Sequence, residues 1–250
     1  MEMCDVLEKH LPSFGRPPKL CREDRLLMTL MDWREYRTQY HIAQTYGLSE
    51  SAVSRTIRVI EGALMRSGSF HLPGKKALTK SDVQYQVVVI DATECTVERP
   101  KKQRQSYSGK KKRHTQKAQL VADQKTKRIL ATAFSEGKLH DFKLHDFKLL
   151  GKSRLAILPA TQCLADSGYQ GLTKLHDNSQ TPYKRDKRHP LTQEQREHNR
   201  QLSRERFVIE HIIRSLKIFR ILSERYRNRR RRFGLRFNLI AAIYNFELND

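Results

Sequence analysis

Apolar residues recur at three- and four-residue spacings through residues 23–65, and this stretch has almost no strand signal. Such spacing is typical of amphipathic helices, because it gathers apolar side chains on one face. The segment SGSFHLPGKK that follows is rich in Gly, Ser and Pro, which favours a linker. We therefore predict a helical domain over residues 1–70 and a linker over residues 71–84.

The pattern changes near residue 85 to alternating strands and helices. Short β-branched and apolar runs predict strands at 86–92, 116–123, 128–135 and 161–165, and helical periodicity predicts helices at 141–150 and 192–222. Alternation of this kind is typical of an α/β layer architecture. Residues 85–250 are therefore predicted to form a second, α/β domain.

The segment HIAQTYGLSESAVSRTI in the helical domain has the form of a helix-turn-helix. Ala43 is small where two helices would cross, and Gly47 stands where the tight turn needs a positive φ. Ser49 is a suitable N-cap for the second helix, and Leu48 with Val53 would form a hydrophobic staple around it. The sequence thus predicts where the second helix begins.

That second helix has one apolar face and one polar face. The apolar face holds Val53, Ile57, Ile60 and Leu64, and the opposite face holds Ser51, Ser54, Arg55 and Arg58. Short hydroxyl side chains and arginines on one exposed face suit contacts with base edges and phosphates in the major groove. The alternative is an ordinary helical hairpin with a solvated polar face.

The charge of the chain strengthens the nucleic-acid interpretation. Its 49 Lys and Arg outnumber 27 Asp and Glu, which gives a formal net charge of +22 and predicts a polyanionic partner. An anionic membrane is the rival partner, but no apolar stretch approaches the roughly 20 residues of a spanning helix. The N-terminus lacks a basic segment followed by an apolar one, and the four cysteines are scattered. These features predict a cytoplasmic protein with reduced thiols and no signal peptide.

The run VVVIDATEC, residues 87–95, places Asp91 in a strand that reads as buried on both faces. A carboxylate in such a place costs several kcal/mol (~2–5) unless a positive charge compensates it. Asp91 is therefore either a turn residue just past the strand or a metal ligand. As a ligand it needs partner carboxylates elsewhere in the chain.

Three later acids could be those partners. Asp166 in CLADSGY ends a short apolar run at a small-residue turn, and Asp141 in GKLHDFK stands at a predicted helix start, where an acid also serves as a cap. Glu210 shares a charged stripe with Arg206, Arg214 and Lys217 on a helix that is otherwise apolar around most of its circumference. We interpret that helix as buried, with its stripe facing a polar site. Surface ion pairs from Glu210 to Arg206 and Arg214 are the alternative.

Asp91, Asp166 and Glu210 would come from two strands and one helix. Three such carboxylates can hold two Mg²⁺ or Mn²⁺ ions about 3.5–4 Å apart for in-line displacement at phosphorus. Hard divalent ions prefer oxygen ligands, and the sequence has no Cys/His cluster that would favour a softer metal.

These motifs resemble those of the DDE transposases of bacterial insertion sequences, of the type related to Harbinger elements. The resemblance covers nearly the whole chain, and the combined pattern is specific. The sequence has D-x-T-E from Asp91, a basic Y-S-G-K-K-K-x-H-T-x-K segment from Tyr107 to Lys117, A-D-x-G-Y around Asp166, and R-x3-E-x6-K made of Arg206, Glu210 and Lys217. Sister families have a Tyr three residues before the Arg, where this chain has Ser203.

The resemblance implies a ribonuclease-H-like catalytic domain, a central mixed sheet flanked by helices, behind an all-α DNA-binding domain. Its implied activity is to cut the ends of a mobile element and join them to target DNA, with Asp91, Asp166 and Glu210 as catalytic metal ligands. Double-stranded DNA, as terminal repeats and target, is the implied partner, and pairing two ends implies at least a homodimer. The basic run at residues 99–114 contains no acid and favours a loop on the DNA backbone. The residues expected to contact DNA are Ser51, Ser54, Arg55, Arg58, Tyr107, Lys110, Lys111, Lys112, Arg113, Arg206 and Lys217.

Two other functions remain open at this point. The first is a structure-directed nuclease of the same fold, which would hydrolyse DNA but join nothing. The second is a domesticated DNA-binding repressor with an inactive catalytic domain, against which the three intact acids argue.

Overall fold

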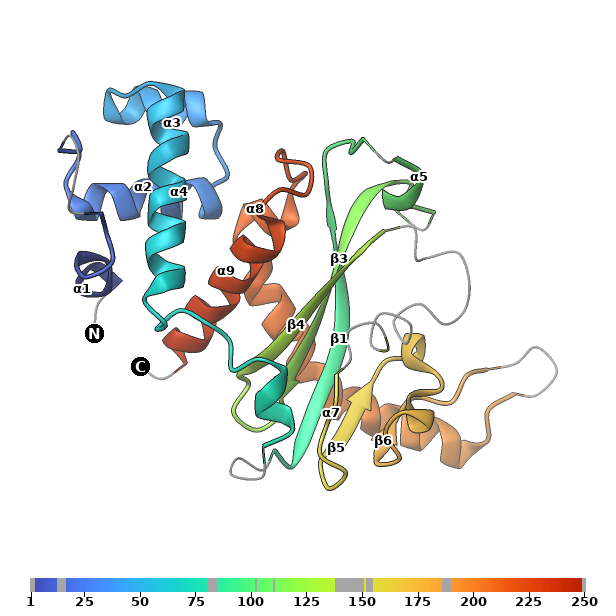
Figure 1. The fold of residues 1–250 in the computed structure, drawn as a ribbon. Helices are drawn as coiled ribbons and strands as arrows, with labels where there is room; N and C mark the ends of the chain where they lie inside the picture. The colour runs from blue at the N-terminus through green and yellow to red at the C-terminus, as the bar shows by residue number, and fades with distance from the viewer. Residues whose placement is uncertain are drawn as a thin grey trace. The chain divides into compact units, whose positions relative to one another are not determined.

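Strand β1 lies at the centre of a mixed sheet (Figure 1). The computed structural model describes residues 3–12, 17–80, 85–101, 103–109, 111–137, 151, 155–185 and 190–248, and within these ranges the sheet has six strands. Strands β3 and β4 extend it by antiparallel pairing on one side of β1, and β5 and β6 extend it by parallel pairing on the other. The strands are β1 (Val87–Thr96), β2 (Tyr107–Ser108), β3 (Arg113–Asp123), β4 (Ile129–Glu136), β5 (Gln162–Ala165) and β6 (Ser179–Gln180).

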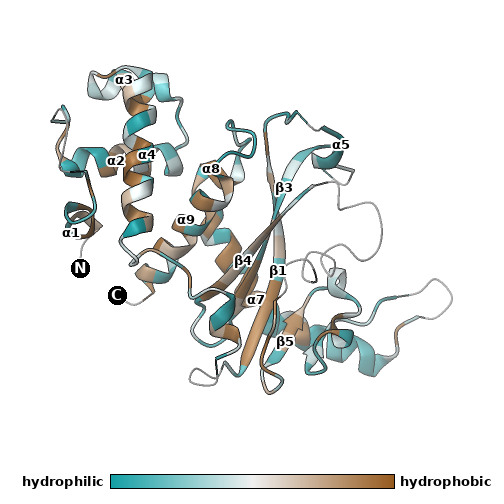
Figure 2. Ribbon diagram, viewed as in Figure 1, coloured by the Kyte–Doolittle hydropathy of each residue, from teal (hydrophilic) through white to brown (hydrophobic). Residues whose placement is uncertain are grey.

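The four strands predicted from the sequence are all present, and the apolar run of β1 is buried as its pattern predicted. Val88, Val89 and Ile90 have no exposed surface. Val88 and Ile90 contribute to a core that also contains Ala165 of β5. Figure 2 shows this half of β1 as hydrophobic and the region around α5 (Gln103–Ser106) as hydrophilic. The strand therefore anchors one end of the sheet in the core and presents its other end to polar residues.

Helix α7 (Gln193–Lys217) crosses one face of the sheet (Figure 1). The predicted helix over 192–222 is divided in the structure, because α7 ends at Lys217 and a separate short helix α8 (Arg220–Ser223) follows. Leu202, Ile209, Ile212 and Leu216 are buried and define the inward side of α7.

The expectation that α7 is buried around most of its circumference was wrong. Phe207 is 55% exposed and Ile218, just after the helix, is 48% exposed. The apolar residues of this segment therefore do not all face the core. The helix is amphipathic instead, with a full outward side. Apolar identity alone could not separate the residues that pack on the sheet from those that face away from it.

The N-terminal residues form a helical unit that the C-terminal residues complete. By contact between residues, 216–225 and 232–250 group with residues 1–71, while 72–215 and 226–231 form the sheet-containing unit. This grouping divides the chain differently from the predicted ranges 1–70 and 85–250, which remain a prediction about domains. The helices of the first unit are α1 (Met3–Glu8), α2 (Arg22–Arg34), α3 (Gln39–Tyr46), α4 (Glu50–Arg66), α8 and α9 (Phe233–Glu247).

Helix α9 is fastened to α4 by a buried cluster of charges. Glu61 of α4 is fully buried, and its two carboxylate oxygens accept hydrogen bonds at 2.5 Å from Nε of Arg232 and of Arg236. Nearby, Phe70 and Phe246 pack ring against ring, with centroids 5.4 Å apart. These contacts explain why the C-terminal helix belongs to the N-terminal unit.

The remaining elements are short and connect the larger ones. The predicted linker contains one turn of 3-10 helix at Lys75–Leu78, and two further turns follow β5 at Ser167–Tyr169 and Leu172–Lys174. The predicted helix at 141–150, with Asp141, lies outside the described residues. All four cysteines are described, and none is joined to another by a disulfide. In the described ranges, no helix combines the length and the apolar character that a membrane span requires.

Candidate metal site and DNA-binding surfaces

Asp91 and Asp166 lie side by side because they follow paired residues of neighbouring parallel strands. Ile90 of β1 pairs with Ala165 of β5, and the two acids are the next residues along the chain. Adjacent strands lie about 4.8 Å apart. Ile90 and Ala165 both join the same core cluster, so the residues that follow them point to the opposite face of the sheet. The sheet topology thus brings together two acids that are 75 residues apart in sequence.

The surroundings of Asp91 are half-buried. One carboxylate oxygen of Asp91 accepts a hydrogen bond from the backbone N–H of Ala92 at 2.7 Å. Asp91 pairs across the sheet with Leu120, and β1 continues beyond it to Thr96. Asp91 is therefore a residue inside the strand and not a turn residue after it, which rejects the simpler interpretation of its sequence context.

Asp166 occupies a turn, but its side chain does not cap that turn. It precedes the 3-10 turn Ser167–Tyr169, where its backbone oxygen accepts a bond from Tyr169 N at 2.9 Å and its carboxylate makes no capping bond. The carboxylate instead lies 3.5 Å from Nη1 of Arg206 and is 47% exposed. Its oxygens are thus accessible on one side and faced by a cation on the other.

Arg206 brings a largely buried positive charge to Asp166. Its side chain is 11% exposed, and its Nε is buried without a hydrogen-bond partner in the described structure. The neighbouring turn of α7 is held in place by Gln124, whose side-chain amide donates to the backbone oxygen of Glu205 at 3.2 Å. The sequence predicts that Arg206 faces a polar site and contacts DNA, and it gives no signal for Gln124.

Glu210 lies one turn beyond Arg206 on α7 and is exposed. The surface ion pairs that offered a simpler explanation are absent, since in the described part of the chain Glu210 pairs with neither Arg206 nor Arg214. Among the described residues, no three His, Cys, Asp or Glu side chains gather closely enough to hold a metal ion. The structure therefore places the two aspartates together and leaves Glu210 outside their immediate group.

The donor atoms at this site fit a hard divalent cation. Two carboxylates stand at adjacent strand positions, one of them half exposed, and carboxylate oxygen is the ligand type that Mg²⁺ and Mn²⁺ prefer. Arg206 is the cation that faces Asp166, and a metal could replace it as the counter-charge of that carboxylate. The chemistry of the residues present is thus suited to such an ion.

The predicted helix-turn-helix is present as α3, a tight turn and α4. Gly47 has φ 61°, which is the left-handed conformation that the turn requires. Ser49 caps α4, and its hydroxyl accepts a bond from Ala52 N at 3.3 Å. Leu48 packs against a cluster that contains Val53, as expected for the predicted staple. The structure therefore confirms how the sequence begins this helix.

The two faces of α4 are also as predicted. Val53, Ile57, Ile60 and Leu64 have no exposed surface. On the opposite side, Ser51, Arg55 and Arg58 are exposed and Ser54 is half-buried. The four polar residues are thus available on one side of the helix, although their contacts with DNA remain a prediction.

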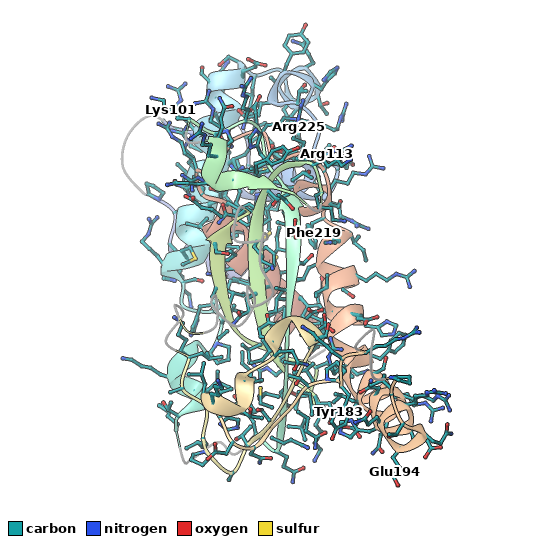
Figure 3. All side chains as sticks on the ribbon, turned by 90° about the vertical axis from the view of Figure 1, so that its right-hand side faces the viewer. Lys101, Arg113, Tyr183, Glu194, Phe219 and Arg225 are labelled. Carbon is teal, nitrogen blue, oxygen red and sulfur yellow. The ribbon has the colours of Figure 1, made fainter. Side chains whose placement is uncertain are left out.

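The predicted basic loop is a short hairpin between β2 and β3. Tyr107 of β2 is 45% exposed, and its ring meets that of His114 edge to face with centroids 5.7 Å apart. Lys111, Lys112 and Arg113 are exposed at the turn, while Lys110 lies outside the described residues. Figure 3 shows Lys101 and Arg113 at one end of the sheet, and Tyr183 and Glu194 toward the other. The hairpin is therefore a positively charged surface at the end of the sheet.

A second basic block follows at residues 223–237, and its second half packs within the protein. Tyr226 pairs with Val97 beside the first basic run, and Arg230 forms an ion pair with Glu136. Arg232 and Arg236, in contrast, pair with buried Glu61, and Phe233 and Phe237 are buried too. The second half is covered because it continues into α9, a helix that faces the core.

Lys217 is the last residue of α7 and is half-buried. It forms no ion pair within the described residues. Its ammonium is thus not committed to a partner in the described structure, as the prediction of a phosphate contact requires.

Comparison with known proteins agrees with this arrangement. Residues 90–245 match the family described as "DDE superfamily endonuclease", and residues 18–70 match "Helix-turn-helix of DDE superfamily endonuclease". The chain belongs to the DDE transposase family. Members of this family are metal-dependent DNA transposases or endonucleases, so the chain is an enzyme that uses a divalent metal and binds DNA. The sheet-containing region is accordingly a ribonuclease-H-like domain.

Individual relatives support the same assignment. The chain is 52% identical to "Probable transposase for insertion sequence element IS702" from Microchaete diplosiphon, with 98% of this chain and 89% of that protein covered. It also has a weak similarity to the structure of "Mos1 transposase paired-end complex with left transposon end", at 15% identity and a TM-score of 0.20. That match covers 68% of this chain and 60% of the other. The family assignment does not depend on it.

Proposed function

We propose that this transposase binds the terminal repeats of a mobile element, cuts the DNA at those ends and joins the cut ends to target DNA. The observation that carries the proposal is the adjacency of Asp91 and Asp166 at paired strand positions, with Arg206 against Asp166. A metal-dependent reaction on DNA needs such a cluster of acids, and the family supplies the substrate class.

Asp91, Asp166 and Glu210 would hold the metal, as two Mg²⁺ or Mn²⁺ ions. Bound divalent ions of this kind activate a water or 3′-hydroxyl nucleophile and stabilise the oxygen that leaves phosphorus. Asp91 and Asp166 supply ligands from the rigid sheet, whereas exposed Glu210 would have to turn toward them from α7. Arg206 would then be released from Asp166 and could face a phosphate of the DNA.

The remaining residues would bind and orient DNA. Ser51, Ser54, Arg55 and Arg58 would contact the terminal repeat, and the hairpin residues Tyr107, Lys110, Lys111, Lys112 and Arg113 would hold the backbone, with Lys217 near the cut site. Two ends must be held together for joining, so the active form would be at least a homodimer, working on the bacterial chromosome in the cytoplasm.

The test of the site uses variants that keep side-chain shape but remove a ligand charge. Asp91→Asn, Asp166→Asn and Glu210→Gln should each abolish cleavage of end DNA with Mg²⁺ or Mn²⁺, while binding of that DNA stays within a few-fold. Cleavage is measured on labelled end duplexes and binding by gel shift. Substantial cleavage by the Asp166→Asn protein would remove that residue from the catalytic set.

A strand-joining assay distinguishes the transposase from a nuclease, and an in vivo test distinguishes it from a repressor. Precleaved ends incubated with target DNA should give joined product, which a nuclease that only hydrolyses cannot form. A repressor would keep its function in vivo after substitution of any of the three acids, whereas a transposase would lose it.

A further inference from the structure

The outward side of α7 carries a row of arginines that contains one phenylalanine. On an ideal helix the residues turn by about 100° each, and the row lies within roughly 60° of Phe207. Every member of the row is exposed. The row consists of Arg196, Arg200, Arg204, Phe207, His211 and Arg214.

The row is positive along its whole length. Its four arginines form no ion pair in the described part of the chain, although i, i+4 pairs are common on helices. Glu210 is the only acid within the same sector of α7, since Glu194, Glu197 and Glu205 lie more than about 60° from Phe207. From Arg196 to Arg214 the row extends about 27 Å at 1.5 Å per residue. That length matches about eight nucleotides of one DNA strand at 3.4 Å each.

Phe207 is a large apolar side chain that is exposed to solvent. It is 55% exposed, and its ring meets the ring of His211 edge to face, with centroids 4.3 Å apart and planes at 89°. His211 therefore contacts the phenyl ring but leaves more than half of the Phe207 surface exposed. Phe207 is also three residues from Glu210, a spacing that makes side chains neighbours on a helix surface. A largely exposed aromatic ring thus stands next to a proposed metal ligand.

We propose that the outward side of α7 binds the DNA strand beside the cut site, with Phe207 stacking on one base there and the arginines contacting phosphates. The inference rests on the proposed function. Basic surfaces that follow a backbone, with aromatic rings on which bases stack, are the usual means of binding an unpaired strand. A second copy of the chain is a weaker occupant, because its net charge of +22 would be repelled by the arginine row.

The aromatic part of the proposal is tested with Phe207→Ala and Phe207→Trp in the full-length protein. Loss of one stacked base should weaken binding of precleaved end DNA by roughly 5- to 150-fold, and cleavage should fall with it. The Trp variant keeps an aromatic face and should stay within a few-fold of wild type. Each variant is checked by thermal unfolding, which should not change because Phe207 is exposed.

Tyr183→Ala is the matched control. Tyr183 is 50% exposed and meets His198 of α7 edge to face, with centroids 5.1 Å apart. His198 lies about 180° around the helix from Phe207. Asn199 bonds both the backbone N–H and the backbone oxygen of Tyr183, so the substitution keeps those bonds. Tyr183→Ala should therefore bind and cut end DNA as wild type does.

Stacking is located by removing bases from the DNA. An abasic site is placed in turn at each of several nucleotides around the cut. At one position it should weaken wild-type binding as much as Phe207→Ala does, and it should not weaken the Phe207→Ala protein further. Additive losses at every position would overturn the stacking assignment.

The arginine part is tested through the salt dependence of binding. Arg200→Gln and Arg214→Gln should each lower the slope of log affinity against log salt by about 0.7–0.9, the value of one phosphate contact. Lys174→Gln removes an exposed cation outside α7 and should leave the slope unchanged.

The proposal fails if Phe207→Ala binds and cuts end DNA as wild type does. It also fails if the substitution splits an oligomer and shows no coupling to any abasic site, because Phe207 would then belong to a protein interface. Neither result touches the proposed function, which depends on the Asp91, Asp166 and Glu210 variants instead.

Discussion

Glu61 and Asp166 are both acids in contact with arginine, yet the two units of the molecule use them differently. Glu61 is fully buried and bonded at 2.5 Å by Arg232 and Arg236. Asp166 is 47% exposed and lies 3.5 Å from one arginine. In the first contact, both carboxylate oxygens are paired with arginines of the protein. The second leaves carboxylate oxygens accessible, as a metal ligand requires.

The difference teaches that a carboxylate–arginine contact is informative only together with its burial. A buried acid must be fully paired, because an uncompensated charge inside a protein is costly. Glu61 more than meets that condition, since it is paired with both Arg232 and Arg236. Solvent can reach Asp166 and compensate part of its charge, so its partner is exchangeable. A fully buried and fully paired carboxylate therefore indicates a structural role. A half-exposed carboxylate with one arginine partner indicates a functional site.

The largest expected effect comes from breaking the closed cluster. Glu61→Gln should destabilise the N-terminal unit by about 3–5 kcal/mol, because the buried Arg236 would be left without its counter-charge. Trp33 is the only tryptophan of the chain and is buried in that unit, so its fluorescence during urea unfolding reports this loss. Asp166→Asn is the matched change at the open contact and should destabilise the protein less, because Asp166 is 47% exposed and lies 3.5 Å from a single arginine. Equal shifts for the two variants would remove the distinction between the clusters.

An intermediate effect is expected on the exposed face of α4, where Arg55 and Arg58 are exposed to solvent. Arg55→Ala and Arg58→Ala should each weaken binding of end DNA by about 1–3 kcal/mol, the value of one specific interaction with a base. The unfolding transition followed by Trp33 should not move, since both arginines are exposed. Titrations with end DNA and random DNA distinguish base-reading residues from backbone contacts. A loss of the same factor for both DNAs would show that these arginines hold only the backbone.

A third effect is expected for Lys217 at the end of α7. Lys217→Ala should lower cleavage tenfold or more by misplacing a phosphate near the metal site, and Lys217→Arg should retain part of the activity. Stability should barely change, because Lys217 forms no ion pair in the described part of the chain. Cleavage and joining are measured near physiological salt. Wild-type rates for Lys217→Ala would mean that the lysine only solubilises the helix end.

Much of the fold could be predicted because its signals are local. The β-branched run of β1 predicts a buried central strand. The turn at Gly47 and the N-cap at Ser49 predict the start of α4 within a few residues. The two aspartates could be proposed as partners because each follows an apolar run. Their adjacency, however, depends on the pairing of β1 with β5, which no local pattern contains.

The features that were missed depend on packing over long distances. The sequence does not predict α9, because its apolar residues lie on all sides of the helix and give no amphipathic period, and because it follows a basic run. The partners of Glu61 are more than 170 residues away in sequence. On α7, the apolar character of Phe207 and Ile218 suggested a core, and only the position of the sheet decides that Ile209 faces inward. The residue type determines which side chains can be buried, and the packing of neighbouring elements determines which of them are buried.

The place of α9 in the N-terminal unit also has a consequence for how the protein is made. Ribosomes add about 5–20 residues each second, so Arg232 is synthesised roughly 10 to 30 seconds after Glu61. During that interval α4 exists without the helix that closes its buried charge. A nascent chain therefore acquires its completed helical unit only once α9 has been synthesised, after the segments that carry Asp91 and Asp166. Messages cut short before α9 would yield proteins that hold both aspartates but lack a finished helical unit.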